Sequence, residues 1–135
     1  MVANELAAAF PDGFPLTPGH TLVVPRRHEA DYFALTVPEQ TAMWGLVRLA
    51  RKRLQRGQTP DGWNLGINVG AAGGQTVGHT HIHLIPRYAG DVDDPRGGIR
   101  WLIPARARYW APRSPSARTS AGRSPSGSPR SRPPS

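Results

Sequence analysis

The sequence predicts an α+β domain in which a largely antiparallel sheet packs against one long amphipathic helix. Most apolar segments are short, rich in β-branched residues and bounded by turn residues, as strands are. One segment, residues 37–56, instead repeats apolar residues at helical spacing. Strands and helices do not alternate along the chain, so a parallel sheet built from βαβ units is not expected.

Four strands are predicted, in this order along the chain: Leu6–Phe10, Thr21–Val24, Trp63–Val69 and His79–Ile85. The first two are apolar runs beside turns that contain proline and glycine. The third alternates imperfectly, and the fourth alternates histidines with other residues. We expect Pro86 to end the fourth strand, because proline has no N–H to donate to a sheet.

The predicted helix begins after Thr36, which Glu39 follows three residues later. That spacing is typical of a capping box, in which each of the two side chains binds the backbone N–H of the other residue. Apolar residues then follow at helical spacing. The helix is predicted to run from Val37 to Arg56 and to end at Gly57.

Length and composition narrow the class of protein. The 135 residues suit one domain, and the absence of cysteine excludes disulfides, thiolate catalysis and cysteine-based zinc sites. No apolar run is long enough to cross a membrane, and residues 1–10 lack the features of a signal peptide. We therefore expect a cytoplasmic protein without membrane contact.

The net charge of +8 is distributed unevenly. Residues 111–135 consist mainly of Ser, Pro, Arg and Gly and carry five arginines and no acid, a composition that predicts a disordered tail. Residues 1–110, the predicted folded domain, carry the remaining +3, which suits an anionic small ligand. Such a tail could contact RNA or be a solvated extension, and composition leaves both open.

The candidate chemistry lies in the fourth predicted strand. Side chains alternate between the two faces of a strand, so His79, His81 and His83 are expected on one face, about 6.6 Å apart. Thr80 and its neighbours on the other face can pack under the helix. We expect the histidines to line a cleft.

A glycine-rich loop, residues 70–78, leads into these histidines. Glycines let backbone N–H groups converge on an anion, and Gln75 and Thr76 add neutral donors. Imidazole can attack phosphorus while such donors stabilise the charge on oxygen. The pattern favours phosphoryl or nucleotidyl transfer without a metal or other cofactor.

Two other interpretations stay open at this point. Two histidines separated by one residue on a strand also form a common zinc pair, although no acidic residue lies near in sequence to complete the site. The three histidines could also be structural, although three in register on one face make that a weaker explanation.

The segment His79-Thr80-His81-Ile82-His83-Leu84-Ile85 resembles the signature of the histidine-triad (HIT) superfamily, in which apolar residues separate three histidines. Further blocks are similar to the same family: residues 18–28, 62–70, 74–77, and 93–98 with Trp101. The last block resembles a bacterial branch of HIT hydrolases. The resemblance extends over about residues 4–110.

The resemblance implies a HIT-like fold, a nucleotide substrate and a homodimer. It implies cleavage at the α-phosphorus of phosphoramidates or dinucleoside polyphosphates, by hydrolysis or nucleotidyl transfer. In that reaction His81 would form a nucleotidyl-histidine intermediate. His79 and His83 would flank it and polarise the phosphate, and His20 would complete the histidine cluster.

The resemblance also suggests which residues bind the substrate. Asp12 falls where the family holds the ribose hydroxyls, a task that suits a carboxylate. Asn68, Gln75 and Thr76 match positions around the phosphates. His28 matches a recurrent position, for which we expect a structural or surface role.

Departures from the family pattern motivate an alternative. Thr80 is polar where the family has an apolar residue, and Gly78 replaces a larger side chain. The sequence also begins almost at the first strand, where many relatives have a further segment that builds part of the nucleobase pocket. The alternative is a nucleotide-binding regulatory or interaction protein whose catalysis is reduced or lost.

Overall fold

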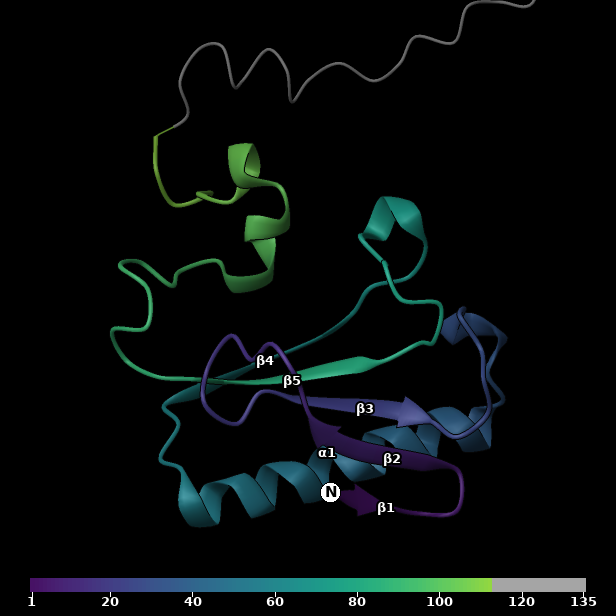
Figure 1. The fold of residues 1–135 in the computed structure, drawn as a ribbon. Helices are drawn as coiled ribbons and strands as arrows, with labels where there is room; N and C mark the ends of the chain where they lie inside the picture. Colours follow the sequence, from purple (N-terminus) through teal and green to yellow (C-terminus); the bar gives the residue numbers. More distant parts are fainter. Residues whose placement is uncertain (113–135) are drawn as a thin grey trace, which may run out of the picture. The chain divides into compact units, whose positions relative to one another are not determined.

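A five-stranded sheet and one helix, α1, form the main body of the protein (Figure 1). The structure is a computed structural model and describes residues 1–112. The sheet has the strand order β1-β2-β3-β5-β4, and every neighbouring pair is antiparallel. The elements are β1 (Val2–Ala3), β2 (Ala7–Pro11), β3 (Thr21–Pro25), α1 (Val37–Gly57), β4 (Gly62–Ile67) and β5 (Ile82–Arg87). The predicted α+β class is confirmed.

The helix forms where its sequence signals place it. The Thr36 hydroxyl accepts a hydrogen bond from the Glu39 N–H at 3.2 Å, and the Glu39 carboxylate accepts one from the Thr36 N–H at 3.0 Å. These two bonds are the predicted capping box. At the other end, α1 includes Gly57 and closes with a bond from the Gln58 N–H to the Leu54 carbonyl.

One face of the sheet packs on α1 and forms the core. Met43 of α1 is fully buried, as are Val23 of β3 and the pair Ile82 and Leu84 of β5. Burial of each such side chain stabilises the fold by roughly 1.5–3 kcal/mol. Because side chains alternate along a strand, the residues between these core positions point to the opposite face of the sheet.

β5 differs from its prediction at both ends. Pro86 does not end the strand, which runs on to Arg87. The Pro86 carbonyl accepts a hydrogen bond from the hydroxyl of Thr17, in the loop before β3. The β3 pairing has already stopped at Leu84, so no β3 carbonyl requires an N–H from Pro86.

The strand prediction also missed one element and shifted others. β1 has only two residues, too few to show a periodic pattern. β2 and β4 begin or end one or two residues away from their predicted bounds. The loop after β4 contains a short 3-10 turn, Ala71–Gly73, and another, Tyr32–Ala34, precedes α1.

Internal contacts divide the chain into two units after Asp94. The second unit, from Pro95, contains two 3-10 turns, Gly98–Leu102 and Pro104–Arg106. Within it arginine side chains stack on aromatic rings, with Arg100 4.9 Å from the centre of the Tyr109 ring. Most of the predicted disordered tail, residues 113–135, lies outside the described residues. Within residues 1–112, no helix combines the length and apolar character needed to cross a membrane.

Candidate functional site

The three clustered histidines lie where β5 begins. Residues 79–84 alternate between half-buried and buried as predicted: the histidines are half-buried, whereas Thr80, Ile82 and Leu84 are fully buried. The strand itself starts at Ile82 and not at His79. The reason is that the Thr80 N–H bonds to the carbonyl of Glu29, in the loop after β3, and not to a strand.

His81 has a ring orientation that leaves one nitrogen available. Its Nδ1 lies 3.0 Å from the backbone carbonyl oxygen of His79. A carbonyl can only accept, so Nδ1 carries the proton in the neutral ring. The lone pair of neutral His81 is therefore on Nε2, the atom a nucleophilic imidazole uses.

His20 and His83 form a second fixed pair beside His81. The Leu16 N–H donates to Nδ1 of His20 at 3.0 Å, so neutral His20 carries its proton on Nε2. That Nε2–H donates to Nδ1 of His83 at 2.9 Å. Neutral His83 must then carry its own proton on Nε2, as a donor.

The surroundings favour the neutral form of both of these rings. Burial lowers the pKa of His20, and the nearby carboxylate of Asp12 opposes that effect in part. Burial also lowers the pKa of His83, and the neighbouring His81 and His20 lower it further. The site thus contains an unprotonated nitrogen on His81 and an N–H on His83, and the centres of these two rings are 4.9 Å apart. A phosphate could meet both.

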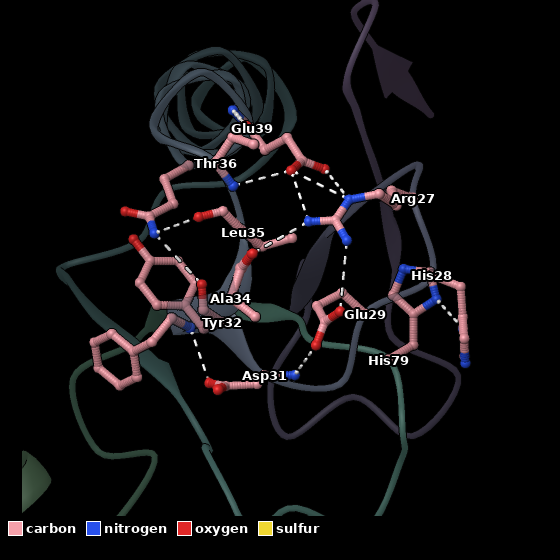
Figure 2. Close-up of polar contacts among 12 residues, drawn as sticks. Arg27, His28, Glu29, Asp31, Tyr32, Ala34, Leu35, Thr36, Glu39 and His79 are labelled. Atoms are coloured by element: carbon pink, nitrogen blue, oxygen red, sulfur yellow. Dashed lines mark hydrogen bonds and ion pairs between the residues drawn. The ribbon is translucent and has the colours of Figure 1, made fainter.

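The His79 ring is engaged elsewhere. Its Nε2 donates to the carbonyl of Pro25 at 2.8 Å, and its Nδ1 lies 3.2 Å from Nδ1 of His28. Figure 2 shows the two rings side by side. The structure therefore groups His20, His81 and His83, while both nitrogens of His79 bond within the protein.

Comparison with known proteins identifies the family of this chain. The HIT domain model matches residues 1–90. The chain belongs to the HIT family. A HIT-like protein of Mycoplasma genitalium is 40% identical over 85 residues, which cover 63% of this chain and 60% of that protein. The bis(5'-nucleosyl)-tetraphosphatase (asymmetrical) of Schizosaccharomyces pombe is 37% identical, over 67% of this chain and 50% of that protein.

Solved HIT structures share the fold. A HIT family protein from Bacillus anthracis has a TM-score of 0.64 and 40% sequence identity, covering 67% of this chain and 64% of that one. The matched region thus spans less than two thirds of the length of these relatives.

The other residues predicted for the site are Asp12, Asn68, Gln75 and Thr76. Asp12 directly follows β2; its Oδ1 accepts from the Phe14 N–H at 2.8 Å, and its Oδ2 lies 3.4 Å from Nε2 of His20. Asn68 directly follows β4, whose last residue Ile67 pairs with Ile82. That register brings Asn68 to the end of the sheet where His81 lies.

Gln75 and Thr76 lie in the predicted anion-binding loop. The Gln75 amide is occupied: its oxygen accepts from the Gly70 N–H, and its nitrogen donates to the carbonyls of Ala30 and Val77. Gly70 has a φ of 76°, which favours glycine. Thr76 is exposed.

Three groups are close enough to hold a metal ion: Asp12, His20 and His83 offer ligand atoms within 4.8 Å of one another. Their hydrogen bonds oppose coordination. As long as the Leu16 N–H bonds to Nδ1 of His20, the proton of that neutral ring stays on Nε2, the atom that faces the cluster. A metal there would have to break this bond.

Sequence reasoning missed the ion pair of Arg27 and Glu39. The guanidinium donates to both carboxylate oxygens, at 2.9 to 3.3 Å, and to the carbonyl of Ala34 (Figure 2). These bonds from Arg27 are the main reason that the pKa of Glu39 falls to about 2. Only the position of Glu39 in the capping box hinted at it, because nothing in the sequence links it to Arg27.

Proposed function

We propose that this HIT-family chain cleaves nucleotides at the α-phosphorus, with His81 as the nucleophile. The carrying observation is the bond from His81 Nδ1 to the His79 carbonyl. It leaves Nε2 unprotonated, beside the N–H of His83. The S. pombe relative is named for tetraphosphate cleavage, which supports a dinucleoside polyphosphate as one substrate class. A nucleoside phosphoramidate is the other.

The first step transfers the nucleotidyl group to the protein. His81 Nε2 forms a bond to the α-phosphorus as the bond from phosphorus to the leaving oxygen or nitrogen breaks. The leaving group takes the electron pair of that bond. The ring becomes an imidazolium, whose Nδ1–H still bonds to the His79 carbonyl. The N–H of His83 stabilises charge on a phosphate oxygen.

In the second step an acceptor removes the nucleotidyl group. Water attacks phosphorus, and the bond from phosphorus to His81 Nε2 breaks with its electron pair returning to Nε2, which restores the neutral ring. The attacking water releases its proton to the solvent. A phosphate acceptor in place of water would make the same protein a nucleotidyl transferase. Neutral His20 and His83 do not compete for this proton near pH 7, because burial lowers their pKa values.

The sheet face opposite α1 offers a place for the nucleoside. Ala8 pairs with Val24, and Phe10 pairs with Leu22, which also pairs with His83. Paired residues share a face, and all four apolar side chains are only half-buried. A nucleobase can lie on this floor, with its ribose hydroxyls at Asp12 and its phosphates near Asn68 and Thr76. Gln75 would act through the loop it holds.

The test is release of nucleoside monophosphate from diadenosine tetraphosphate and from an adenosine phosphoramidate, with and without chelator. We expect chelator-resistant release by the wild type and none by His81→Ala. Protein quenched in alkaline denaturant and analysed by mass spectrometry should carry one nucleotidyl group in the wild type alone. Thermal melting shows that the variant is folded. Full turnover by folded His81→Ala would refute the proposal.

A nucleotide-binding protein with lost catalysis is the second candidate. It is favoured by one observation: the match spans 60% of the M. genitalium relative, so groups outside this region could be needed for turnover. Equal nucleotide affinity in wild type and His81→Ala, with no release by either, would establish it.

We also propose that the chain is a homodimer, as the family resemblance implies. β4 is at the edge of the sheet, and the groove beside it combines apolar residues, Trp44, Trp63 and Leu65 among them, with the basic residues Arg48, Arg51 and Lys52. Light scattering of the full chain tests this, with Leu65→Arg expected to yield monomers. Cytoplasmic location and RNA contact through the tail, residues 111–135, stay predictions. Deleting that tail should abolish RNA binding if the second is correct.

A further inference from the structure

We infer that Arg27 is a positioning residue for His81, acting through the peptide bond between His79 and Thr80. The expected effect of Arg27 on the rate of nucleotide release rests on the proposed function. Its expected effect on which ring nitrogen of His81 carries the proton does not. A chain of contacts connects the start of α1 to the ring of His81.

The first link is a single peptide unit. Its carbonyl, from His79, accepts the Nδ1–H of His81 at 3.0 Å. Its N–H, from Thr80, donates to the carbonyl of Glu29 at 2.7 Å. Because the unit is planar, the Glu29 carbonyl fixes the direction in which the His79 carbonyl points. Donation at one end of an amide also strengthens acceptance at the other.

The second link is formed by residues 25–30, the end of β3 and the loop after it, which hold residues 75–80 at several points. The Pro25 carbonyl accepts from the His79 ring, and the Ala30 carbonyl accepts from the Gln75 amide. With the Glu29 carbonyl, three backbone acceptors of residues 25–30 bind residues 75–80. The position of the loop therefore determines the position of the segment that leads into His81.

The third link attaches the loop to α1. Arg27 lies within the loop, and its guanidinium binds Glu39 of α1, the Ala34 carbonyl and, at 3.5 Å, the Glu29 carboxylate (Figure 2). The Glu29 carboxylate in turn accepts from the Asp31 N–H at 3.2 Å. Arg27 thus ties both ends of this loop to the first turn of the helix.

Releasing this contact would be costly because of the burial of Glu39, although the Arg27 side chain itself is 48% exposed. Glu39 is only 6% exposed, and a buried carboxylate without its partner is strongly unfavourable. A movement of the loop that separates Arg27 from Glu39 is therefore costly in free energy. In the wild type this holds the Glu29 carbonyl, and through it the His79 carbonyl, in one place.

The chain supplies a matched control. Arg87 also makes a two-pronged ion pair, with Asp91 at 2.7 and 2.8 Å, and a bond to Asn64. It lies at the far end of β5 from His81. Arg87→Gln removes a comparable pair of charge-assisted bonds without touching the loop that holds the His79–Thr80 peptide.

The experiment compares the full chain with Arg27→Gln, Arg27→Lys and Arg87→Gln. Long-range ¹H–¹⁵N spectra at a pH where histidines are neutral report which ring nitrogen of His81 carries the proton; His81→Asn assigns the signal. We expect Nδ1 protonation in the wild type and Arg87→Gln, and a mixture of both forms in Arg27→Gln. Arg27→Lys, which keeps the charge but lacks the fork, should lie between.

Nucleotide release at saturating substrate is the second measurement. Loss of one oriented hydrogen bond predicts a fall of about threefold to tenfold in kcat for Arg27→Gln, with KM little changed. A His81 signal identical in wild type, Arg27→Gln and Arg27→Lys would overturn the inference. If Arg27→Gln does not fold, Arg27→Lys decides alone. If the wild type shows no turnover but the His81 signal still shifts in Arg27→Gln, the enzyme proposal is refuted and the positioning role is kept.

Discussion

Nε2 of His20 donates to Nδ1 of His83 across 2.9 Å, and this bond determines which nitrogen of His83 faces outward with a proton. His20 is itself fixed by the Leu16 N–H. His20 therefore cannot be altered without changing the hydrogen-bonding character of His83, whereas the tautomer of His20 does not depend on His83.

His20→Asn should lower the rate of nucleotide release by about threefold to tenfold, the range expected for one hydrogen bond. The reason is that His83 then loses the donor that fixes its tautomer. The measurement is steady-state nucleotide release by the wild type, by His20→Asn, by His83→Asn and by the variant that carries both substitutions. Since His20 acts through His83, its substitution should have little further effect when His83 is absent. Equal losses in both backgrounds would contradict this relationship.

Acidification should destabilise the protein below about pH 6.5. The folded state lowers the pKa values of His20 and His83 from 6.5, mainly by burial. As the pH falls below 6.5, these two histidines bind protons in the unfolded chain while they are still unprotonated in the folded protein. The free energy of unfolding therefore decreases. At pH values well above 6.5 both histidines are neutral in the folded and the unfolded state, so this loss of stability does not occur. Urea midpoints between pH 8 and pH 5 test the trend, and His83→Asn should flatten it; a wild-type midpoint that does not fall would contradict it.

Thr80→Val should stabilise the fold by about 1 kcal/mol. The Thr80 side chain is fully buried, and its hydroxyl has no hydrogen-bond partner within residues 1–112. Valine has nearly the same shape without the unsatisfied group. Thr21→Val is the matched control, because that buried hydroxyl donates to the Gly19 carbonyl at 2.9 Å and its loss should destabilise. Urea unfolding measures both, and equal effects would count against this explanation.

Gly19→Ala should destabilise the fold by at least about 1–2 kcal/mol. Gly19 has a φ of 93°, and an added Cβ would lie 3.0 Å from Leu54 and 3.1 Å from Pro86. Gly45→Ala is the control, because that helical position has open space, and alanine there should stabilise by roughly 0.8–1 kcal/mol. Melting temperatures should therefore move in opposite directions. A tolerated Gly19→Ala would show that the turn before His20 can relax.

The sequence predicted those features that arise from local patterns. The capping box of Thr36 and Glu39 located the start of α1, and the alternation of histidines with apolar residues identified the half-buried face. The start of β5 was missed because the Thr80 N–H finds its partner in the Glu29 carbonyl, a contact between distant parts of the chain.

Most of the site could not be predicted for the same reason. The tautomers of His81 and His20 depend on a carbonyl and an N–H of the main chain, which carry no sequence signal. The role of Arg27 depends on its meeting Glu39, twelve positions away. The amide of Gln75 matched a phosphate position by resemblance, yet within the described structure it binds three backbone groups.

The bonds that orient the histidines end largely on main-chain atoms: the Leu16 N–H, the His79 carbonyl and the Pro25 carbonyl. Nearly every amino acid supplies these atoms, so the side chains at such positions can be substituted without rearranging the site. One residue is excluded at position 16. Proline has no N–H, so Leu16→Pro would leave His20 free to turn over its ring, although it alters no residue of the histidine cluster itself.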